Sequence, residues 1–110
     1  MDRFKLVFFA PALPPATLAQ IKSAIFATGA GQYEKYSECC FQTPGIGQFR
    51  PSADANPAIG TAGGEVEQVG EVRLEVLCGS AEIVRKAVEA LKKIHPYEEV
   101  AYDVYKLEDF

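Results

Sequence analysis

The sequence predicts an α+β fold in which two helices cover one face of a four-stranded antiparallel sheet, and three observations support this prediction. Apolar residues recur so that the expected elements follow the order strand, helix, strand, and then the same order again. Each expected helix has a single apolar stripe, so it can cover only one side of a sheet. A long connection rich in glycine and proline separates the two halves. Two right-handed crossovers in this order close a ferredoxin-like βαββαβ sandwich.

The first half of the chain predicts a strand, a helix and a second strand. Residues 3–10 are almost all apolar, which is typical of a central strand buried on both faces. Pro14 and Pro15 suit a first helical turn, and Gly29 and Gly31 suit the positions just past a helix end, so we expect a helix over residues 15–28. Residues 33–43 return to a β pattern and predict the second strand.

Residues 44–64 predict a long connection, because glycines and prolines recur throughout them. We expect a short hairpin arm within this connection, through residues 48–50. Connections of this length are usually functional or mobile, so this segment is a candidate binding arm.

The second half predicts a strand, a helix and a last strand. Residues 65–78 show the clearest alternation in the chain, with apolar residues at even positions from 72 to 78 and charged residues at 71, 73 and 75. Ser80 can cap the next helix, and Pro96 ends it, because proline disfavours a helical conformation in the residue before it. Residues 98–106 predict the last strand.

The sheet face without helices is predicted to be charged. It presents Glu71, Arg73 and Glu75 from the third strand and Asp103 from the last. This face must meet either water or another subunit. Glu71 and Arg73 are candidate ligand contacts in a polar chamber between subunits, and the alternative is that the charged residues of this strand form ion pairs with neighbouring strands.

Composition and charge exclude several classes of protein. A chain of 110 residues, 48% of them hydrophobic and 24% charged, predicts a single globular domain over residues 1–110. The net charge of −4 and the absence of a concentrated basic face disfavour nucleic acid binding. No apolar run is long enough for a membrane span. Three cysteines without regular spacing are not a secreted disulfide framework, so we expect reduced thiols and a cytoplasmic protein.

The stretch from His95 to Asp103 concentrates residues that bind metals or move protons, and it holds the one histidine of the sequence. One hypothesis is a site for a divalent metal ion with His95, Glu98 and Glu99 as ligands. The alternative is structural: His95 ends the second helix as an imidazolium favoured by the helix dipole, and the following turn fixes the strand register. Tyr97 and Tyr102 add candidate ligand contacts with hydroxyl tips.

The connection supplies further candidate ligand contacts: Thr43, Phe49 and Arg50. The forked guanidinium of Arg50 suits a phosphate or carboxylate, although the segment can equally pack against a neighbouring subunit. No glycine pattern here forms a phosphate-binding fingerprint. Cys39 is another candidate ligand contact, and Cys39 or Cys40 can act as a nucleophile only if the fold brings His95 beside it as a base.

Seven stretches, spread in order over nearly the whole chain, resemble the domain inserted in the longer Nif-three-like (YqfO-type) proteins, of which this sequence looks like a stand-alone version. The stretches are Gly29-Ala-Gly31, Tyr36-Ser-Glu-Cys39, Thr43-Pro-Gly45, Phe49-Arg-Pro51, Asn56-Pro-Ala-Ile-Gly60, Glu71-Val-Arg-Leu-Glu75 and His95-Pro-Tyr-Glu-Glu-Val-Ala-Tyr-Asp103. The resemblance implies a PII-like or CutA-like fold with a long ligand-contacting loop. Members of those groups are commonly trimers, which implies a homo-oligomer here.

The resemblance also bears on activity. Longer Nif-three-like proteins carry a two-metal centre in the domains that flank this insert, and some are described as a type 2 GTP cyclohydrolase. One histidine cannot rebuild such an imidazole-rich centre. We therefore expect a small oligomeric ligand- or metal-binding regulatory module without catalysis of its own. The alternatives are a divalent-metal-dependent hydrolase-like enzyme and an accessory chain that docks on a two-domain metal-dependent partner.

Overall fold

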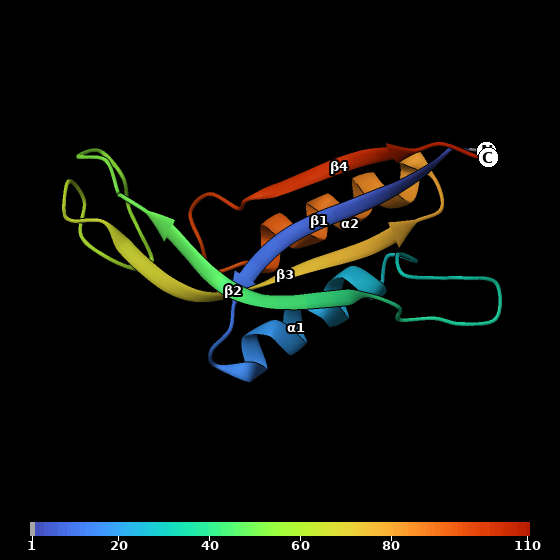
Figure 1. Cartoon of the computed structure of the whole chain (residues 1–110), viewed down its shortest axis with the longest axis horizontal. Coiled ribbons are helices and arrows are strands. Elements are labelled where there is room, and N and C mark those ends of the chain that lie inside the picture. Colours follow the sequence, from blue (N-terminus) through green and yellow to red (C-terminus); the bar gives the residue numbers. More distant parts are fainter. Residues whose placement is uncertain (1) are drawn as a thin grey trace.

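The computed structural model describes residues 2–110, which form two helices and one four-stranded sheet (Figure 1). The elements are β1 (Arg3–Pro11), α1 (Pro15–Phe26), β2 (Phe41–Phe49), β3 (Glu67–Cys78), α2 (Ala81–Ile94) and β4 (Tyr102–Leu107). The strands lie in the order β2-β3-β1-β4, and all neighbouring pairs are antiparallel. The predicted ferredoxin-like sandwich is confirmed.

Both helices lie on the same side of the sheet, and the hydrophobic core fills the space between them (Figure 1). The register pairs Leu6 with Val76 and Phe8 with Leu74, so the even-numbered residues of β1 and β3 share the face that meets the helices. Burying a side chain of this size contributes roughly 1.5–3 kcal/mol. The helices contribute Ile21, Ile25, Val84, Ala87 and Leu91 to this core.

Helix α2 begins and ends where the sequence predicts. The Ser80 hydroxyl accepts a hydrogen bond from the Ile83 N–H at 3.2 Å and so caps the first turn. The helix ends at Ile94, two residues before Pro96. Helix α1 is two residues shorter at its end than the predicted 15–28, and Gly29 follows with a positive φ of 97°.

The predicted second strand over residues 33–43 is wrong in position. The backbone takes positive φ angles at Glu34 and Glu38 (33° and 55°), so residues 33–40 turn instead of extending. Strand β2 occupies Phe41–Phe49, most of which was predicted to belong to the connection over residues 44–64. Pro44 and its glycine neighbours are tolerated there because β2 is an edge strand, where one side of the ladder carries no hydrogen bonds.

The far ends of β2 and β3 extend beyond the rest of the sheet as a two-stranded arm (Figure 1). Strand β1 ends at Pro11, which pairs with Glu71, so the β2–β3 pairs from Ile46–Gly70 to Phe49–Glu67 have no third strand beside them. We call the paired ends of these two strands, residues 46–49 and 67–70, the hairpin arm. It gives the molecule its elongated shape, 46 × 24 × 23 Å.

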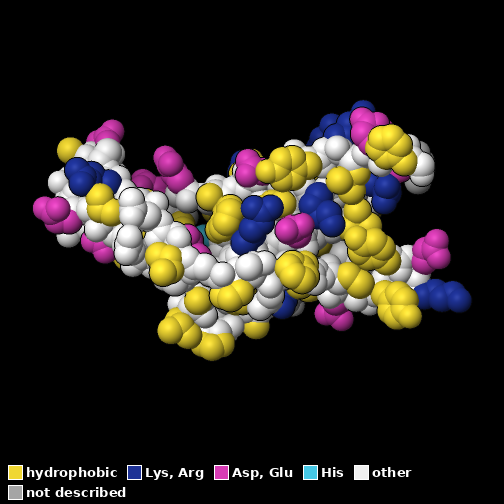
Figure 2. All heavy atoms as spheres, in the orientation of Figure 1, with side chains coloured by type: hydrophobic (Ala, Val, Ile, Leu, Met, Phe, Trp, Pro, Cys, Tyr) yellow, Lys and Arg dark blue, Asp and Glu magenta, His cyan; other side chains and the backbone are white. Residues whose placement is uncertain are grey.

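The uncovered face of the sheet is charged, as predicted. Glu75 of β3 lies opposite Val7 of β1, which lies opposite Asp103 of β4, so all three share the face without helices. Arg73 and Glu75 form an ion pair at 3.5 Å. Figure 2, in the orientation of Figure 1, shows charged and hydrophobic side chains mixed over the molecule's surface. Among residues 2–110, neither helix has the length and apolar character needed to cross a membrane.

Candidate functional site

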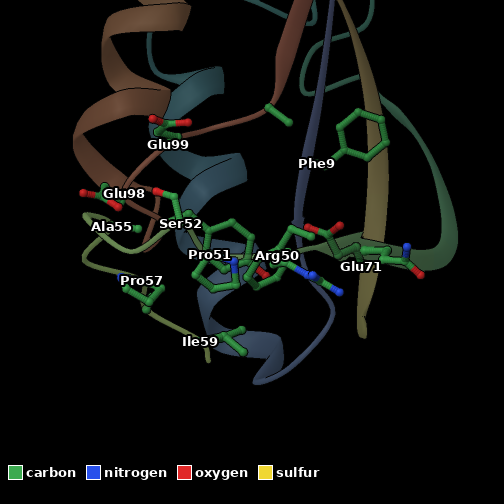
Figure 3. A pocket seen from close by; sticks show the side chains of 15 residues that line it. Phe9, Arg50, Pro51, Ser52, Ala55, Pro57, Ile59, Glu71, Glu98 and Glu99 are labelled. Atoms are coloured by element: carbon green, nitrogen blue, oxygen red, sulfur yellow. The ribbon is translucent and has the colours of Figure 1, made fainter. Parts of the chain in front are cut away.

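A cavity of about 370 Å³ lies between the hairpin arm and the turn that joins α2 to β4 (Figure 3). We call it the arm cavity. The sheet and the arm contribute charged and aromatic side chains, the connection between β2 and β3 contributes an apolar wall, and the turn contributes a tyrosine and two glutamates. Its lining includes Phe9, Phe49, Arg50, Pro51, Pro57, Ile59, Glu71, Tyr97, Glu98 and Glu99.

The turn is held in place by His95, which is 6% exposed. Its Nε2 lies 2.7 Å from the Phe9 carbonyl oxygen, and its Nδ1 accepts a hydrogen bond from the Tyr97 N–H at 3.1 Å. A carbonyl only accepts and an N–H only donates, so the proton of the neutral ring sits on Nε2. Burial lowers the pKa of His95, against a smaller opposing effect of the bond to Phe9. The interpretation of His95 as a dipole-stabilised imidazolium is therefore wrong.

Tyr97 follows directly and places its ring edge against the imidazole, with 4.8 Å between ring centroids. Its hydroxyl oxygen is buried and has no hydrogen-bond partner within the part of the chain that the structure describes. Burial raises the pKa of Tyr97, and the charge of Glu71 raises it further. An unpaired buried hydroxyl costs about 1–3 kcal/mol, and a hydrogen-bond partner would offset that cost.

Glu71 contributes a half-buried carboxylate from β3. The carboxylate lies over Gly47 of the neighbouring strand, so that a methyl group at Gly47 would occupy its position. Burial raises the pKa of Glu71, because the charged form loses water. Among residues 2–110 this carboxylate has no ion-pair partner.

The connection and the turn are tied together by Glu98, whose Oε1 accepts a hydrogen bond from the Asn56 N–H at 3.0 Å. Glu99 lies beside it on the cavity wall (Figure 3). Glu99 was expected in the last strand, but β4 begins only at Tyr102. Residues 95–101 are instead a turn that faces the arm.

The residues proposed as metal ligands do not form a metal site. Both ring nitrogens of His95 are used in hydrogen bonds, and Glu98 holds the connection. Within residues 2–110, no three histidine, cysteine or acidic side chains are grouped so that they could hold a metal ion. A metal at His95 would have to replace one of its two bonds.

The structure brings together four of the predicted ligand contacts in the arm cavity, namely Phe49, Arg50, Glu71 and Tyr97. Two others, Thr43 and Arg73, line a second cavity of about 300 Å³, which shares Phe9 and Glu71 with the first.

Tyr102 and Cys39 line neither of these cavities. The Tyr102 ring packs against the helix-covered core, with Lys92 Nζ 5.4 Å from its centroid. The Cys39 thiol lies in the turn before β2 and donates to the Ser37 carbonyl oxygen at 3.6 Å.

Sequence reasoning missed the apolar half of the arm cavity. Phe9 reaches it from β1, and Pro51, Pro57 and Ile59 form its outer wall. Pro51 is buried and Ile59 half-buried although both lie in the glycine- and proline-rich segment between β2 and β3. An isoleucine and several prolines inside the connection could have indicated this wall, because a fully solvated loop does not need apolar side chains.

Comparison with known proteins agrees with this description. No protein-family model matches the chain. A Bacillus subtilis protein named "GTP cyclohydrolase 1 type 2 homolog" is 45% identical over 89 residues, which cover 81% of this chain and 23% of that protein. A Bacillus cereus structure described as a protein related to NIF3 covers 98% of this chain and 26% of that chain, with a TM-score of 0.78 and 37% identity. This domain belongs to the NIF3/YqfO family. It spans about a quarter of the length of these relatives.

More distant structures show the fold of this NIF3-family domain. The match to CutA from Archaeoglobus fulgidus covers 100% of this chain and 87% of the CutA chain, with a TM-score of 0.66 and 17% identity. The match to GlnK from B. subtilis, solved with ATP, covers 96% of this chain and 82% of the GlnK chain, with a TM-score of 0.59 and 13% identity. The predicted PII/CutA-like fold is confirmed.

Proposed function

We propose that this NIF3-family domain is a small-molecule-binding regulatory module, built as a single PII/CutA-like domain over residues 1–110, that works as a homo-oligomer without catalysis of its own. The observation that carries this proposal is the arm cavity, in which a buried, unpaired Tyr97 hydroxyl lies near the unpaired carboxylate of Glu71. Polar groups placed in an otherwise apolar cavity are the usual means of orienting a small ligand.

Binding is favoured over catalysis by the state of the one histidine. A general base needs a free ring nitrogen within reach of the substrate. His95 is buried, and both of its nitrogens are bonded to the backbone. Among the thiols, Cys78 is buried and its pKa is raised to about 11 by the loss of water, which makes it a poor nucleophile.

Oligomerisation is supported by apolar side chains on the edge strands. Phe41 and Ile46 of β2 are 68% and 77% exposed, and Tyr105 of β4 is 50% exposed. Two helices cover one face only, so the charged face and the β2 edge are free for other copies of the chain. We expect a trimer, with a mass of three times the 12.0 kDa chain by size-exclusion chromatography with light scattering. A stable monomer at all concentrations would count against it.

Ligand binding is tested with two matched variants of the connection. Ala58 and Ala62 are both exposed, but only Ala58 lines the arm cavity. In a thermal-shift screen of nucleotides, amines, amino acids and divalent metal ions, we expect at least one compound to raise the melting temperature of the wild type and of Ala62→Phe. The same compound should not shift Ala58→Phe. A screen with no shift in the wild type, or equal shifts in both variants, would contradict the proposal.

A second candidate is an accessory role beside a larger partner. The coverage favours it, because the chain matches about a quarter of proteins several times its length. The domain would then dock on a two-domain, metal-dependent partner and adjust its activity. Co-purification of a defined two-domain NIF3-family protein with the tagged domain tests this role, and two separate elution peaks on mixing would contradict it.

A divalent-metal-dependent hydrolase-like activity stays a prediction that the geometry at His95 does not support. Elemental analysis of the purified protein, together with assays before and after chelation, tests it directly.

A further inference from the structure

We propose that the arm cavity selects a small organic cation with an apolar body, and that Glu71 binds the cationic group. This inference rests on the proposed ligand-binding function and names the chemical class of the ligand. Its four supports are the balance of charge in the cavity, the carboxylate of Glu71, the unpaired hydroxyl of Tyr97 and the apolar composition of the walls.

The charge that lines the cavity is predominantly negative. Glu71, Glu98 and Glu99 contribute carboxylates, and Arg50 is the one cationic lining residue. Arg50, Glu98 and Glu99 are all exposed residues, so water screens their charges, whereas Glu71 is half-buried and its charge is screened less. An anion such as a nucleotide phosphate would meet three carboxylates for one guanidinium, whereas a cation gains from the same arrangement.

Glu71 is the carboxylate best placed to bind. Glu98 already accepts a bond from the Asn56 N–H, while Glu71 has no ion-pair partner within the described residues. Glu71 also lines both the arm cavity and the second cavity, so its carboxylate lies where the two meet. A half-buried carboxylate with no ion pair among the described residues has lost water without gaining a charged partner, and an ammonium or guanidinium group would supply one.

A second observation points to a ligand independently of the acidic residues. The Tyr97 hydroxyl oxygen is buried and unpaired within residues 2–110, and the Tyr97 side chain lines the same cavity as Glu71. A hydroxyl can accept a hydrogen bond from the N–H of a cationic group that also reaches Glu71. One ligand group would therefore satisfy both side chains.

The walls explain why the ligand should carry an apolar body. Phe49, Pro51, Pro57 and Ile59 line the side of the cavity formed by the arm and the connection. Aromatic faces such as those of Phe9 and Tyr97 also attract cations. An inorganic cation would leave this apolar surface unused, so the cavity suits an organic amine better than a metal ion.

The test compares two compounds with the same aromatic body and opposite charge, 2-phenylethylamine and 3-phenylpropanoate. Titrations of the 110-residue chain are followed by the backbone resonances of the turn and the connection. We expect the amine to bind at least ~10-fold more tightly than the carboxylate, because a hydrogen bond to a charged group is worth about this factor. Equal or tighter binding of 3-phenylpropanoate would overturn the inference.

Two substitutions locate the effect at Glu71. Glu71→Gln keeps the shape and removes the charge, so the preference for the amine should disappear. Gly47→Ala leaves the charge in place but displaces the carboxylate, and we expect amine binding to weaken severalfold. Gly45→Ala is the matched control, because a methyl group there meets no atom within 4 Å. Each variant is first checked for a wild-type melting profile. A preference unchanged in Glu71→Gln would refute the role of Glu71.

The same experiment separates this inference from the proposed function. If ATP or 3-phenylpropanoate shifts the cavity resonances and the amine does not, the cavity binds ligands but does not select cations. If no compound of any charge shifts them in either this titration or the thermal screen, the ligand-binding function itself fails.

Discussion

The pH dependence of stability should carry the signature of one buried histidine. His95 is the single histidine of the chain, so any histidine contribution belongs to it. Its pKa is lowered in the folded state by burial, while in the unfolded chain it returns to about 6.5. As the pH falls below about 6.5, the unfolded state therefore binds a proton that the folded state does not accept, and stability is lost. Above that pH the ring is neutral in both states and contributes no slope.

The magnitude follows from linkage. If the folded state took up no proton at all, the free energy of unfolding would fall by about 2 kcal/mol between pH 7 and pH 5. This is an upper limit, because the folded ring begins to titrate at its own lowered pKa. Loss of about 1 kcal/mol or more is measurable against the 5–15 kcal/mol that is typical of small domains.

The assay is urea denaturation at pH 7, 6 and 5, on the wild type and on His95→Gln. The glutamine nitrogen can take the place of Nε2 and donate to the Phe9 carbonyl, while the side chain no longer titrates. The carboxylates, including Glu71 with its raised pKa, remain in both proteins and cancel in the difference. We expect the wild type to lose more stability than His95→Gln as the pH falls. Parallel curves, or a wild type that gains relative stability at pH 5, would refute a buried neutral imidazole.

Four further outcomes test the packing and the site. His95→Ala should lower the free energy of unfolding by about 3 kcal/mol at pH 7 in urea denaturation, because two backbone groups lose their hydrogen-bond partner and the ring leaves a void. A loss below about 0.5 kcal/mol would contradict this expectation. Ser80→Ala should cost about 1 kcal/mol in the same assay through loss of the helix cap, and an unchanged midpoint would show that the cap adds nothing. Titration with Ellman's reagent should modify Cys39 and Cys40 in the native protein and Cys78 only after unfolding, because Cys78 is buried and its pKa is raised to about 11. Three thiols that react equally fast would contradict the structure. Tyr97→Phe should leave stability unchanged or raise it by up to about 1 kcal/mol, because it removes an unpaired buried hydroxyl, whereas a clear loss of stability would mean that the hydroxyl has a partner.

The elements that could be predicted from the sequence are those whose signals are local. The alternation of charged and apolar residues from 71 to 76 predicted the faces of β3, and Ser80 and Pro96 marked the limits of α2 to within a residue or two. These signals depend on residues close together in the chain. The order of elements and the single apolar stripe on each helix were then enough to predict the sandwich and its charged reverse face.

The position of β2 could not be predicted because it depends on the finished sheet. Pro44, Gly45 and Gly47 are typical of a connection, and they would disrupt a central strand. They are compatible with β2 only because β3 is its sole neighbour, so that half of its backbone groups need no partner in the sheet. At Gly47 the lack of a side chain also leaves room for the Glu71 carboxylate.

The candidate site was predicted in its residues but not in its geometry. Arg50, Glu71 and Tyr97 were recognised by their chemistry. Their convergence depends on contacts between distant parts of the chain, such as the bond from the Asn56 N–H to Glu98 across 42 residues. Likewise, the bond of His95 to a carbonyl 86 residues away is what distinguishes a structural histidine from a metal ligand.

The turn after α2 links the stability of the fold to the shape of the cavity. His95 holds the turn against β1 through the Phe9 carbonyl, and its Nδ1 fixes the Tyr97 backbone two residues later. Phe9 and Tyr97 are also cavity walls, so the bonds that stabilise the turn set the positions of two side chains that a ligand would meet. In a purely structural turn, phenylalanine would fill nearly the same space as Tyr97 without leaving a buried hydroxyl unpaired. An unpaired hydroxyl and a carboxylate without an ion pair on the walls of one cavity are better explained by a ligand that uses both.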